Sequence, residues 1–172
     1  MVFTLRPAGQ DDLPHLTTLY QRAFPDEPLL PLVKALMTWG VLALVAVDDV
    51  GTVAGHVMLS PCSVGGGHDA VALLGPLAVL PTMQRRGLGR ALVAGGLERL
   101  AASGVVKVLV LGDPAYYSQL GFAPERAISA PYPVPDGWQT AWQSQTLHPA
   151  GDLVSGPLSV LPPWQKKALW LP

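Results

Sequence analysis

The sequence has a single cysteine, Cys62, among its 172 residues. One thiol cannot form an intramolecular disulfide, and a zinc site needs several Cys or His ligands, so we expect neither a disulfide framework nor a metal. A lone thiol is also typical of proteins from a reducing compartment, which favours the cytoplasm. We expect Cys62 to be a small buried hydrophobic residue rather than an acyl carrier, because no neighbour in the sequence would lower its pKa.

Charged residues are scarce as well, at 13% of the chain, and they nearly cancel to a net charge of −1. Without an excess of positive charge, no extended face can neutralise a phosphate backbone, so we expect no nucleic acid partner. Hydrophobic residues make up 49% of the chain, which excludes a disordered protein. With so few charges, part of the surface must be apolar, and a homodimer interface is one use for it.

Long apolar runs are missing too. The longest uninterrupted one, Val41–Val47, is seven residues, whereas a bilayer span needs about 20. Arg6 and the pair Asp11-Asp12 leave no room for the hydrophobic core of a signal peptide. We therefore expect no membrane segment and a cytoplasmic protein. The length favours one domain spanning residues 1–172.

Hydrophobic periodicity predicts a mixed α/β fold. In chain order, the predicted elements are a strand at Val2–Arg6, helices at Asp11–Ala23 and Leu29–Trp39, strands at Val41–Val47, Thr52–Ser60 and His68–Leu80, a helix at Leu88–Ala102, and a strand at Val105–Leu111. The three strands joined by short turns predict an antiparallel meander. The strand, helix and strand that follow predict a parallel βαβ unit.

Prolines interrupt every window after Phe122, and we predict only two strands there, near Gln139–Leu147 and Leu158–Leu161. The same region holds four of the five tryptophans, Trp138, Trp142, Trp164 and Trp170. Large aromatic side chains need to be packed, yet an irregular backbone makes it difficult to bury all four in one chain. We therefore expect residues after about 126 to form the interface of a homodimer.

The segment Leu77–Leu92 carries the strongest functional signal, because a strand ends at Pro81, passes through a basic turn, and enters a helix through two glycines. The first amides of a helix have no internal partners and lie at the positive end of its dipole. Glycine lets a phosphate approach these amides. Residues 84–107 hold five basic residues against one acidic residue. This pattern favours a diphosphate site; a simple tight turn with solvated arginines is the alternative.

Two familiar phosphate-binding loops do not fit. A Walker loop needs Lys and then Ser or Thr after its last glycine, where this chain has Arg90 and Ala91. A Rossmann fingerprint needs a third glycine at the position of Leu92. Neither class of nucleotide loop is therefore expected.

The segment Gln84-Arg85-Arg86-Gly87-Leu88-Gly89 instead resembles the signature of the GCN5-related N-acetyltransferase (GNAT) superfamily. A second block follows at Leu111–Phe122, where a strand leads to a short helix with a tyrosine four residues before Gly-Phe. The resemblance covers about residues 2–126 and leaves a Pro- and Trp-rich tail. It implies a mixed α/β fold whose central, mostly antiparallel sheet is flanked by helices and splays between its fourth and fifth strands, at the Leu80/Leu111 pair.

The resemblance also implies a reaction, the direct transfer of an acetyl group from acetyl-CoA to an amine. The turn would hold the pyrophosphate of acetyl-CoA, and the preceding strand would hold its pantetheine arm. The implied cofactor-binding residues are Leu77, Ala78, Val79, Gln84, Arg85, Arg86, Gly87, Leu88, Gly89 and Arg90.

Tyr117 matches the family tyrosine that protonates the departing thiolate. A phenol with a pKa of about 10 can donate to a thiolate whose conjugate acid has a pKa of about 8.5. Packing in the core is the alternative, and it is the favoured interpretation for Tyr116. Asp113 stands where many relatives carry an asparagine that contacts the cofactor, and a carboxylate would repel phosphates.

Three further residues are candidates for the acceptor site. His56 is either a base that faces the amine or a hydrogen-bonded histidine of the sheet. Asp26 and Glu27 fall where family members line the acceptor pocket, and carboxylates favour a cationic amine; a solvated loop is the alternative. Small-molecule amines and protein amino groups both remain open as acceptors. A non-catalytic acyl-CoA-binding regulatory module and a structural dimerisation domain are the alternatives to an enzyme.

Overall fold

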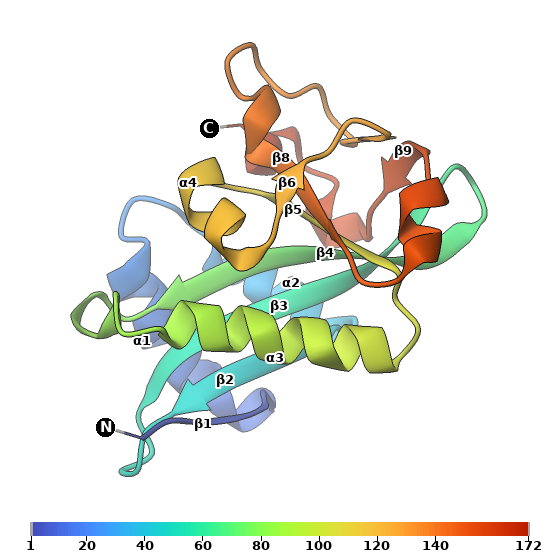
Figure 1. The fold of residues 1–172 in the computed structure, drawn as a ribbon. Coiled ribbons are helices and arrows are strands. Elements are labelled where there is room, and N and C mark those ends of the chain that lie inside the picture. Colours follow the sequence, from blue (N-terminus) through green and yellow to red (C-terminus); the bar gives the residue numbers. More distant parts are fainter. Residues whose placement is uncertain (1, 172) are drawn as a thin grey trace. The chain divides into compact units, whose positions relative to one another are not determined.

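The structure is a computed structural model that describes residues 2–171, apart from the side chains of His68 and Asp69. It shows a mixed α/β fold in which helices flank a mostly antiparallel sheet with a parallel pair, β4 and β5 (Figure 1). The α-helices are α1 (Leu13–Ala23), α2 (Leu30–Thr38), α3 (Leu88–Ala102) and α4 (Pro114–Tyr117). The strands are β1 (Thr4–Pro7), β2 (Leu42–Val47), β3 (Val53–Val64), β4 (His68–Val79), β5 (Lys107–Leu111), β6 (Ala123–Pro124), β7 (Ile128–Ser129), β8 (Trp142–Thr146) and β9 (Gly156–Ser159). None of the helices described between residues 2 and 171 has both the length and the apolar character to cross a bilayer.

The chain divides into two compact units. The first unit comprises Met1–Leu59 and Gly75–Glu98, and the second comprises Ser60–Leu74 and Arg99–Pro172. Strands β3 and β4 and helix α3 each run from one unit into the other, so each unit contains part of these elements.

In the first unit, β1, β2 and β3 pair antiparallel. The register of β2 on β3 runs from Leu42↔Leu59 to Ala46↔Gly55, after which a bulge shifts it. This confirms the first antiparallel pair of the predicted meander. The side chains of β2 from residue 43 to residue 46 are buried, which explains their uniformly apolar character.

Helices α1 and α2 bury one face each in the first unit. The buried residues follow the three-and-four spacing of an amphipathic helix: Leu16, Leu19 and Tyr20 on α1, and Leu32, Val33 and Leu36 on α2. Helix α1 begins at Leu13 and not at Asp11, because Gln10–Asp12 forms a 3₁₀ turn. The Asp12 carboxylate is held there by Arg6 at 2.7 Å.

Helix α3 begins at Leu88, as predicted, and packs closely on the sheet of the first unit. A Cβ atom on Gly96 would lie 2.7 Å from Cδ1 of the Leu59 side chain, so helix α3 and strand β3 approach each other closely at this glycine.

In the second unit, β4 pairs with β5 in parallel over Val71–Leu73, which confirms the predicted βαβ connection. Strand β5 continues its antiparallel pairing with β8 up to Leu111. The pairing of β4 with β5 itself ends at Leu73. The two strands therefore stop pairing earlier than at the Leu80/Leu111 pair, where we expected them to part.

The tail contains short strands joined by 3₁₀ turns. The two predicted strands are present as β8 and β9, but β8 is shorter than Gln139–Leu147, and β9 begins two residues before Leu158. Strands β6 and β7 have two residues each and could not be predicted, because two residues define no period.

The tail buries three of its four tryptophans within the second unit. The ring of Trp170 lies 5.8 Å from that of Trp142 and 5.9 Å from that of Trp164, measured between centroids. The Trp164 indole N–H donates to Ser60 Oγ (3.1 Å), whereas Trp138 is 44% exposed. The expectation that an irregular backbone makes these rings difficult to bury is wrong for three of the four, because 3₁₀ turns and indole hydrogen bonds pack Trp142, Trp164 and Trp170 within the chain. The buried tryptophans give no argument for a dimer.

Candidate active site

The loop before α3 has a backbone shape suited to an anion. Arg85 has a φ of 63° and Gly87 a φ of 81°, so two left-handed residues flank Arg86. Turns that mix right- and left-handed residues direct successive N–H groups towards one point and form an anion-binding nest. The left-handed conformation costs an arginine roughly 1–2 kcal/mol, and such strain is concentrated at functional turns.

The amino end of α3 adds further N–H groups. Its first helical hydrogen bond runs from the Ala91 N–H to the Gly87 carbonyl (3.0 Å). The amides of Leu88 and Gly89 therefore precede the helical ladder and lie at the positive end of the helix dipole. A Cβ atom on Gly87 would meet no atom within 4 Å, which leaves room for a phosphate group. Loop and helix end together fit a diphosphate.

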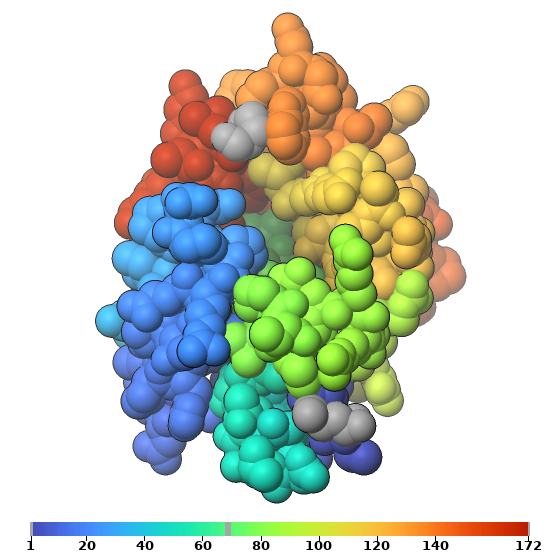
Figure 2. All heavy atoms as spheres, turned by 90° about the vertical axis from the view of Figure 1, so that its left-hand side faces the viewer, coloured from blue at the N-terminus to red at the C-terminus, as the bar shows by residue number. Residues whose placement is uncertain are grey.

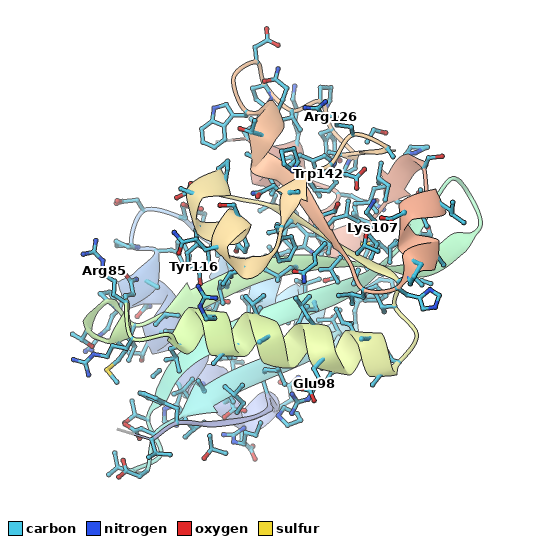
Figure 3. The ribbon with its side chains drawn as sticks, in the orientation of Figure 1. Arg85, Glu98, Lys107, Tyr116, Arg126 and Trp142 are labelled. Atoms are coloured by element: carbon cyan, nitrogen blue, oxygen red, sulfur yellow. The ribbon has the colours of Figure 1, made fainter. Side chains whose placement is uncertain are left out.

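Side chains around the loop complete this cradle, by which we mean residues Gln84–Arg90. Gln84 ties the loop to β4, because its Nε2 donates to the Val79 carbonyl (3.2 Å). Arg85, Arg86 and Arg90 are exposed. Figure 3 shows Arg85 on the loop at the amino end of α3, and the acidic Glu98 far along the same helix. Positive charge is thus gathered where the amides are open.

Strand β4 ends with Leu77, Ala78 and Val79, just before the cradle. The Leu80 N–H donates to the Ala54 carbonyl on β3 (2.9 Å). Since consecutive residues of a strand turn their peptide groups to opposite edges, those of Leu77 and Val79 point away from β3. Strand β5 pairs only with the earlier part of β4. This edge can therefore receive an extended ligand.

The turn between α1 and α2 borders a pocket of about 560 Å³ in the first unit. Asp26 and Glu27 line it, together with Tyr20 and Phe24, whose rings stack at 6.1 Å. The remaining lining consists of one glutamine, two leucines and three prolines, so no basic side chain borders it among the described residues. Aromatic faces and carboxylates without a basic neighbour suit a cationic amine.

Tyr20 and Phe24 are candidate site residues that the sequence analysis missed. Tyr20 lies on the buried face of α1, which periodicity assigns to the core, and Phe24 is the residue at which this helix ends. The available signal was the spacing of four residues between the two rings, at the end of a helix that is followed by the acidic turn of Asp26 and Glu27.

His56 contacts Tyr20 and does not itself line the pocket. Its side chain is fully buried, and its Nδ1 lies 2.7 Å from the Tyr20 hydroxyl oxygen. Its Nε2 has no hydrogen-bond partner within the described structure. Burial lowers the pKa of His56 to about 4, although the charge of Asp12 opposes this shift. His56 is therefore neutral and only a weak base at neutral pH. It is a hydrogen-bonded histidine of the sheet, and its one link to the pocket is the hydrogen bond to Tyr20.

Tyr117 lies at the end of α4 in the second unit. Its ring is buried against Tyr116 and Phe122, with centroid distances of 5.0 and 5.6 Å. Burial raises the pKa of the Tyr117 hydroxyl, with a smaller effect from Tyr116. The hydroxyl therefore stays protonated at neutral pH, as a proton donor must.

Asp113 has a structural position that explains its carboxylate. Its Oδ1 accepts a hydrogen bond from the Ala115 N–H (2.9 Å), so Asp113 is the N-cap of α4. It fixes the start of the short helix that carries Tyr117.

Cys62 is buried, and burial raises the pKa of its thiol to about 12. The thiolate form is therefore negligible at neutral pH, which fits a packing residue and not an acyl carrier. Across the residues that the structure describes, no three His, Cys, Asp or Glu side chains are grouped so as to hold a metal.

The cradle and the pocket lie on one face of the first unit. Figure 2 shows the segment of α1 and α2, in blue, and the loop before α3, in light green, on the same visible side. The candidate residues Asp26 and Glu27 thus share a face with the cradle, and His56 joins them through Tyr20. Tyr117 belongs to the second unit.

Comparison with known proteins assigns the family. Residues 13–122 match the Acetyltransferase (GNAT) family, and the chain belongs to it. Two relatives come from Escherichia coli. The uncharacterized N-acetyltransferase YhbS is 37% identical over 149 residues, which cover 84% of this chain and 86% of YhbS. The uncharacterized N-acetyltransferase YjhQ is 31% identical over 154 residues, 84% of each chain.

Solved structures agree with this assignment. E. coli YhbS, crystallised in complex with CoA, superposes with a TM-score of 0.87 and 32% identity over 95% of this chain and 92% of YhbS. A GNAT family acetyltransferase from Brucella melitensis, in complex with acetyl-CoA, gives a TM-score of 0.78 and 27% identity over 95% of this chain and 99% of its own. The predicted family, fold class and acyltransferase activity are thereby confirmed.

Proposed function

We propose that this protein binds acetyl-CoA at the cradle and transfers the acetyl group to a primary amine held in the α1–α2 pocket. The observation that carries the proposal is the cradle, where strained and open backbone, free helix amides and arginines converge. The relatives crystallised with CoA and acetyl-CoA support it. Gly87, Leu88 and Gly89 would bind the pyrophosphate through their amides, with Arg85, Arg86 and Arg90 around it.

The free edge of β4 would hold the rest of the acyl donor. The peptide groups of Leu77 and Val79 point away from β3 and can pair with the amides of a pantetheine arm, as an added strand would. The Val79 N–H can also donate to the thioester oxygen as charge develops there. Ala78, buried at 1% exposure, keeps this stretch anchored to the core.

The pocket would bind the acceptor. Asp26 and Glu27 raise the local concentration of cationic amines, and the nitrogen must lose a proton to solvent before it can attack. The nitrogen then forms a bond to the carbonyl carbon, and the carbon–sulfur bond breaks. Tyr117 would give its proton to the departing sulfur and regain one from the amide nitrogen by way of water. No covalent intermediate on the protein is needed.

The donor half is tested with a matched pair at Gly87. Asparagine tolerates a positive φ and is nearly isosteric with aspartate, so Gly87→Asn and Gly87→Asp differ mainly in charge. We expect calorimetry to show CoA binding to the parent and to Gly87→Asn, and at least tenfold weaker binding to Gly87→Asp. Gly89→Asp should behave in the same way. Equal affinities in all four proteins would contradict the cradle.

The acceptor half is tested by following thiol release from acetyl-CoA with a panel of small amines and peptides. Turnover that depends on one class of amine supports the enzyme. CoA binding without turnover on any acceptor would favour a regulatory acyl-CoA-binding module. A chain that does not bind CoA would be a structural domain.

A homodimer in the cytoplasm completes the proposal. The tail still exposes three large apolar side chains, Trp138, Leu153 and Leu171, which a second copy could cover. A reducing compartment fits the single buried thiol of Cys62. Light scattering at micromolar concentration decides the assembly, since a species of 18.1 kDa would be a monomer.

A further inference from the structure

A buried hydrogen bond connects the pocket to the sheet of the first unit. Tyr20 lines the pocket, although only 2% of it is exposed, and its hydroxyl oxygen lies 2.7 Å from Nδ1 of His56 on β3. The two rings meet edge to face, with centroids 5.6 Å apart and planes at 79°. Tyr20 therefore contacts both the pocket and the histidine.

The second ring nitrogen of this histidine has no partner. His56 Nε2 is buried, and no group in the described structure hydrogen-bonds to it. An unpaired buried polar atom costs free energy that an apolar side chain in the same place would avoid. Packing alone therefore does not explain a histidine at this position. Charge does not explain it either, because burial lowers the pKa of His56 to about 4.

The position of the single imidazole proton decides what Tyr20 offers to the pocket. With the proton on Nε2, Nδ1 accepts the Tyr20 hydroxyl proton, and the phenolic oxygen keeps its lone pairs for a ligand. With the proton on Nδ1, the histidine donates to Tyr20, and the tyrosine turns its own O–H towards the pocket.

An amine nucleophile distinguishes these two states. Its lone pair must stay free for the attack, so a pocket has to hold it through its N–H groups, and only hydrogen-bond acceptors can do that. The exposed carboxylates of Asp26 and Glu27 are acceptors at the surface of the pocket. Tyr20 lines the same pocket, and its ring stacks on that of Phe24; its phenolic oxygen would be a further acceptor.

We infer that Tyr20 accepts an N–H hydrogen bond from the acceptor amine, and that His56 is a positioning residue that binds the Tyr20 proton and leaves the phenolic oxygen as an acceptor. The inference rests on the proposed function, because it requires the amine to occupy this pocket. It also defines the acceptor as an amine attached to an apolar or aromatic group, since aromatic rings, leucines and prolines form most of the pocket lining.

A matched pair of variants isolates the hydrogen bond. Asparagine places Oδ1 where His56 has Nδ1, and leucine has nearly the same size without an acceptor. With 2-phenylethylamine as the acceptor, we expect His56→Leu and Tyr20→Phe to raise KM about tenfold, the loss of one such bond. Both variants should keep kcat and the CoA affinity within about threefold, as expected when uniform binding is lost. His56→Asn should keep KM within about threefold of the parent.

Nitrogen NMR of the parent gives an independent readout, with His56 assigned from the resonances that disappear in His56→Asn. We expect Nδ1 without a proton and Nε2 with one. A proton on Nδ1 would overturn the inference, and so would an unchanged KM in Tyr20→Phe. This variant differs from the parent by one atom, so it keeps the test valid even if His56→Leu does not fold.

The same panel separates this inference from the proposed function. An active parent whose variants keep its KM for amines contradicts the inference alone. A parent that binds CoA but neither acetylates nor binds 2-phenylethylamine, hexylamine or spermidine contradicts the acceptor pocket, and the inference with it. Preference for spermidine over 2-phenylethylamine and hexylamine would contradict the apolar class of acceptor.

Discussion

Gly112 and Tyr117 are in direct contact, so that the ring of the tyrosine lies over the backbone of the glycine. A Cβ atom on Gly112 would overlap Cε2 of the Tyr117 ring and lie 2.9 Å from Cδ2. Phe122 packs on the same ring, and the Asp113 cap fixes the start of α4. The direction of the Tyr117 hydroxyl therefore depends on a residue without a side chain.

Gly112→Ala should displace the Tyr117 ring. We expect this to lower the free energy of unfolding by about 1–3 kcal/mol, since the site is already filled. Turnover should fall by roughly 10- to 100-fold, because a proton donor acts only when it is in line with the leaving group. Thiol release and chemical denaturation measure the two effects. Gly67→Ala is the control, because its Cβ would meet no atom within 4 Å; equal turnover in both variants would show that the orientation of Tyr117 is unimportant.

Tyr117→Phe should retain the packing of the ring but remove the proton donor. We expect turnover to fall by on the order of 10²-fold with little change in CoA affinity. Because burial raises the pKa of the Tyr117 hydroxyl, its ionisation should not reduce the rate of the parent between pH 6 and 9. Rates are measured by thiol release across this range.

Tyr116→Phe is the control for that experiment, because Tyr116 is 38% exposed on the same short helix. It should keep most of the activity of the parent. A Tyr117→Phe variant as fast as Tyr116→Phe at every pH would remove Tyr117 from the mechanism and leave protonation of the thiolate to water.

The cradle could be predicted from the sequence because its signal is local. Gly87, Gly89 and the arginines follow one another in the chain, and the physics of a helix end applies wherever that helix lies. The left-handed conformation of Arg85 was not predicted, since residues other than glycine, asparagine and aspartate rarely adopt it. The conformation of Arg85 depends on the path of the whole loop.

The pocket and the tail depend on contacts between distant residues, which periodicity does not reveal. Tyr20 and His56 lie 36 positions apart, and the pattern of each segment alone does not show their hydrogen bond. Trp164 and Ser60 lie 104 positions apart. A backbone interrupted by prolines has no period from which to derive such a contact. The residues that bury Trp164 could therefore not be predicted.

Trp170→Ala should destabilise the fold itself. Trp170 is 2% exposed, packs against Trp142 and Trp164, and donates its indole N–H to the Trp164 carbonyl (2.9 Å). We expect the free energy of unfolding to fall by about 3–5 kcal/mol, as for other buried aromatic residues. Chemical denaturation measures the loss. Trp138→Ala, at an exposed position, should cost less than about 1 kcal/mol.

The oligomeric mass shows whether Trp170 packs within its own chain or at an interface between two copies. We expect light scattering to give the same mass for folded Trp170→Ala and for the parent, because the ring is covered by its own chain. If Trp170→Ala kept its stability but had a smaller oligomeric mass than the parent, the buried tryptophans of the tail would belong to an interface between copies.

His56 should make the stability of the protein depend on pH between about 4 and 6.5. Its pKa is lowered from about 6.5 in the unfolded chain to about 4 in the folded protein, so the unfolded chain binds more protons in this range. Stability must therefore be fully present above pH 6.5 and be lost as the pH falls towards 4. Between pH 7 and pH 5 we expect the free energy of unfolding to fall by about 2 kcal/mol, measured by denaturation at each pH.

His56→Leu isolates this effect, because it removes the titrating group and leaves the carboxylates in place. The Arg6 guanidinium holds the pKa of Asp12 below its usual value, so the stability that Asp12 contributes is present above a pH of about 4 and is lost only below it. Between pH 7 and pH 5 the leucine variant should therefore show a nearly constant free energy of unfolding. A variant that loses as much stability as the parent in this range would assign the loss to another group, and would mean that His56 is already protonated, or open to solvent, in the folded protein.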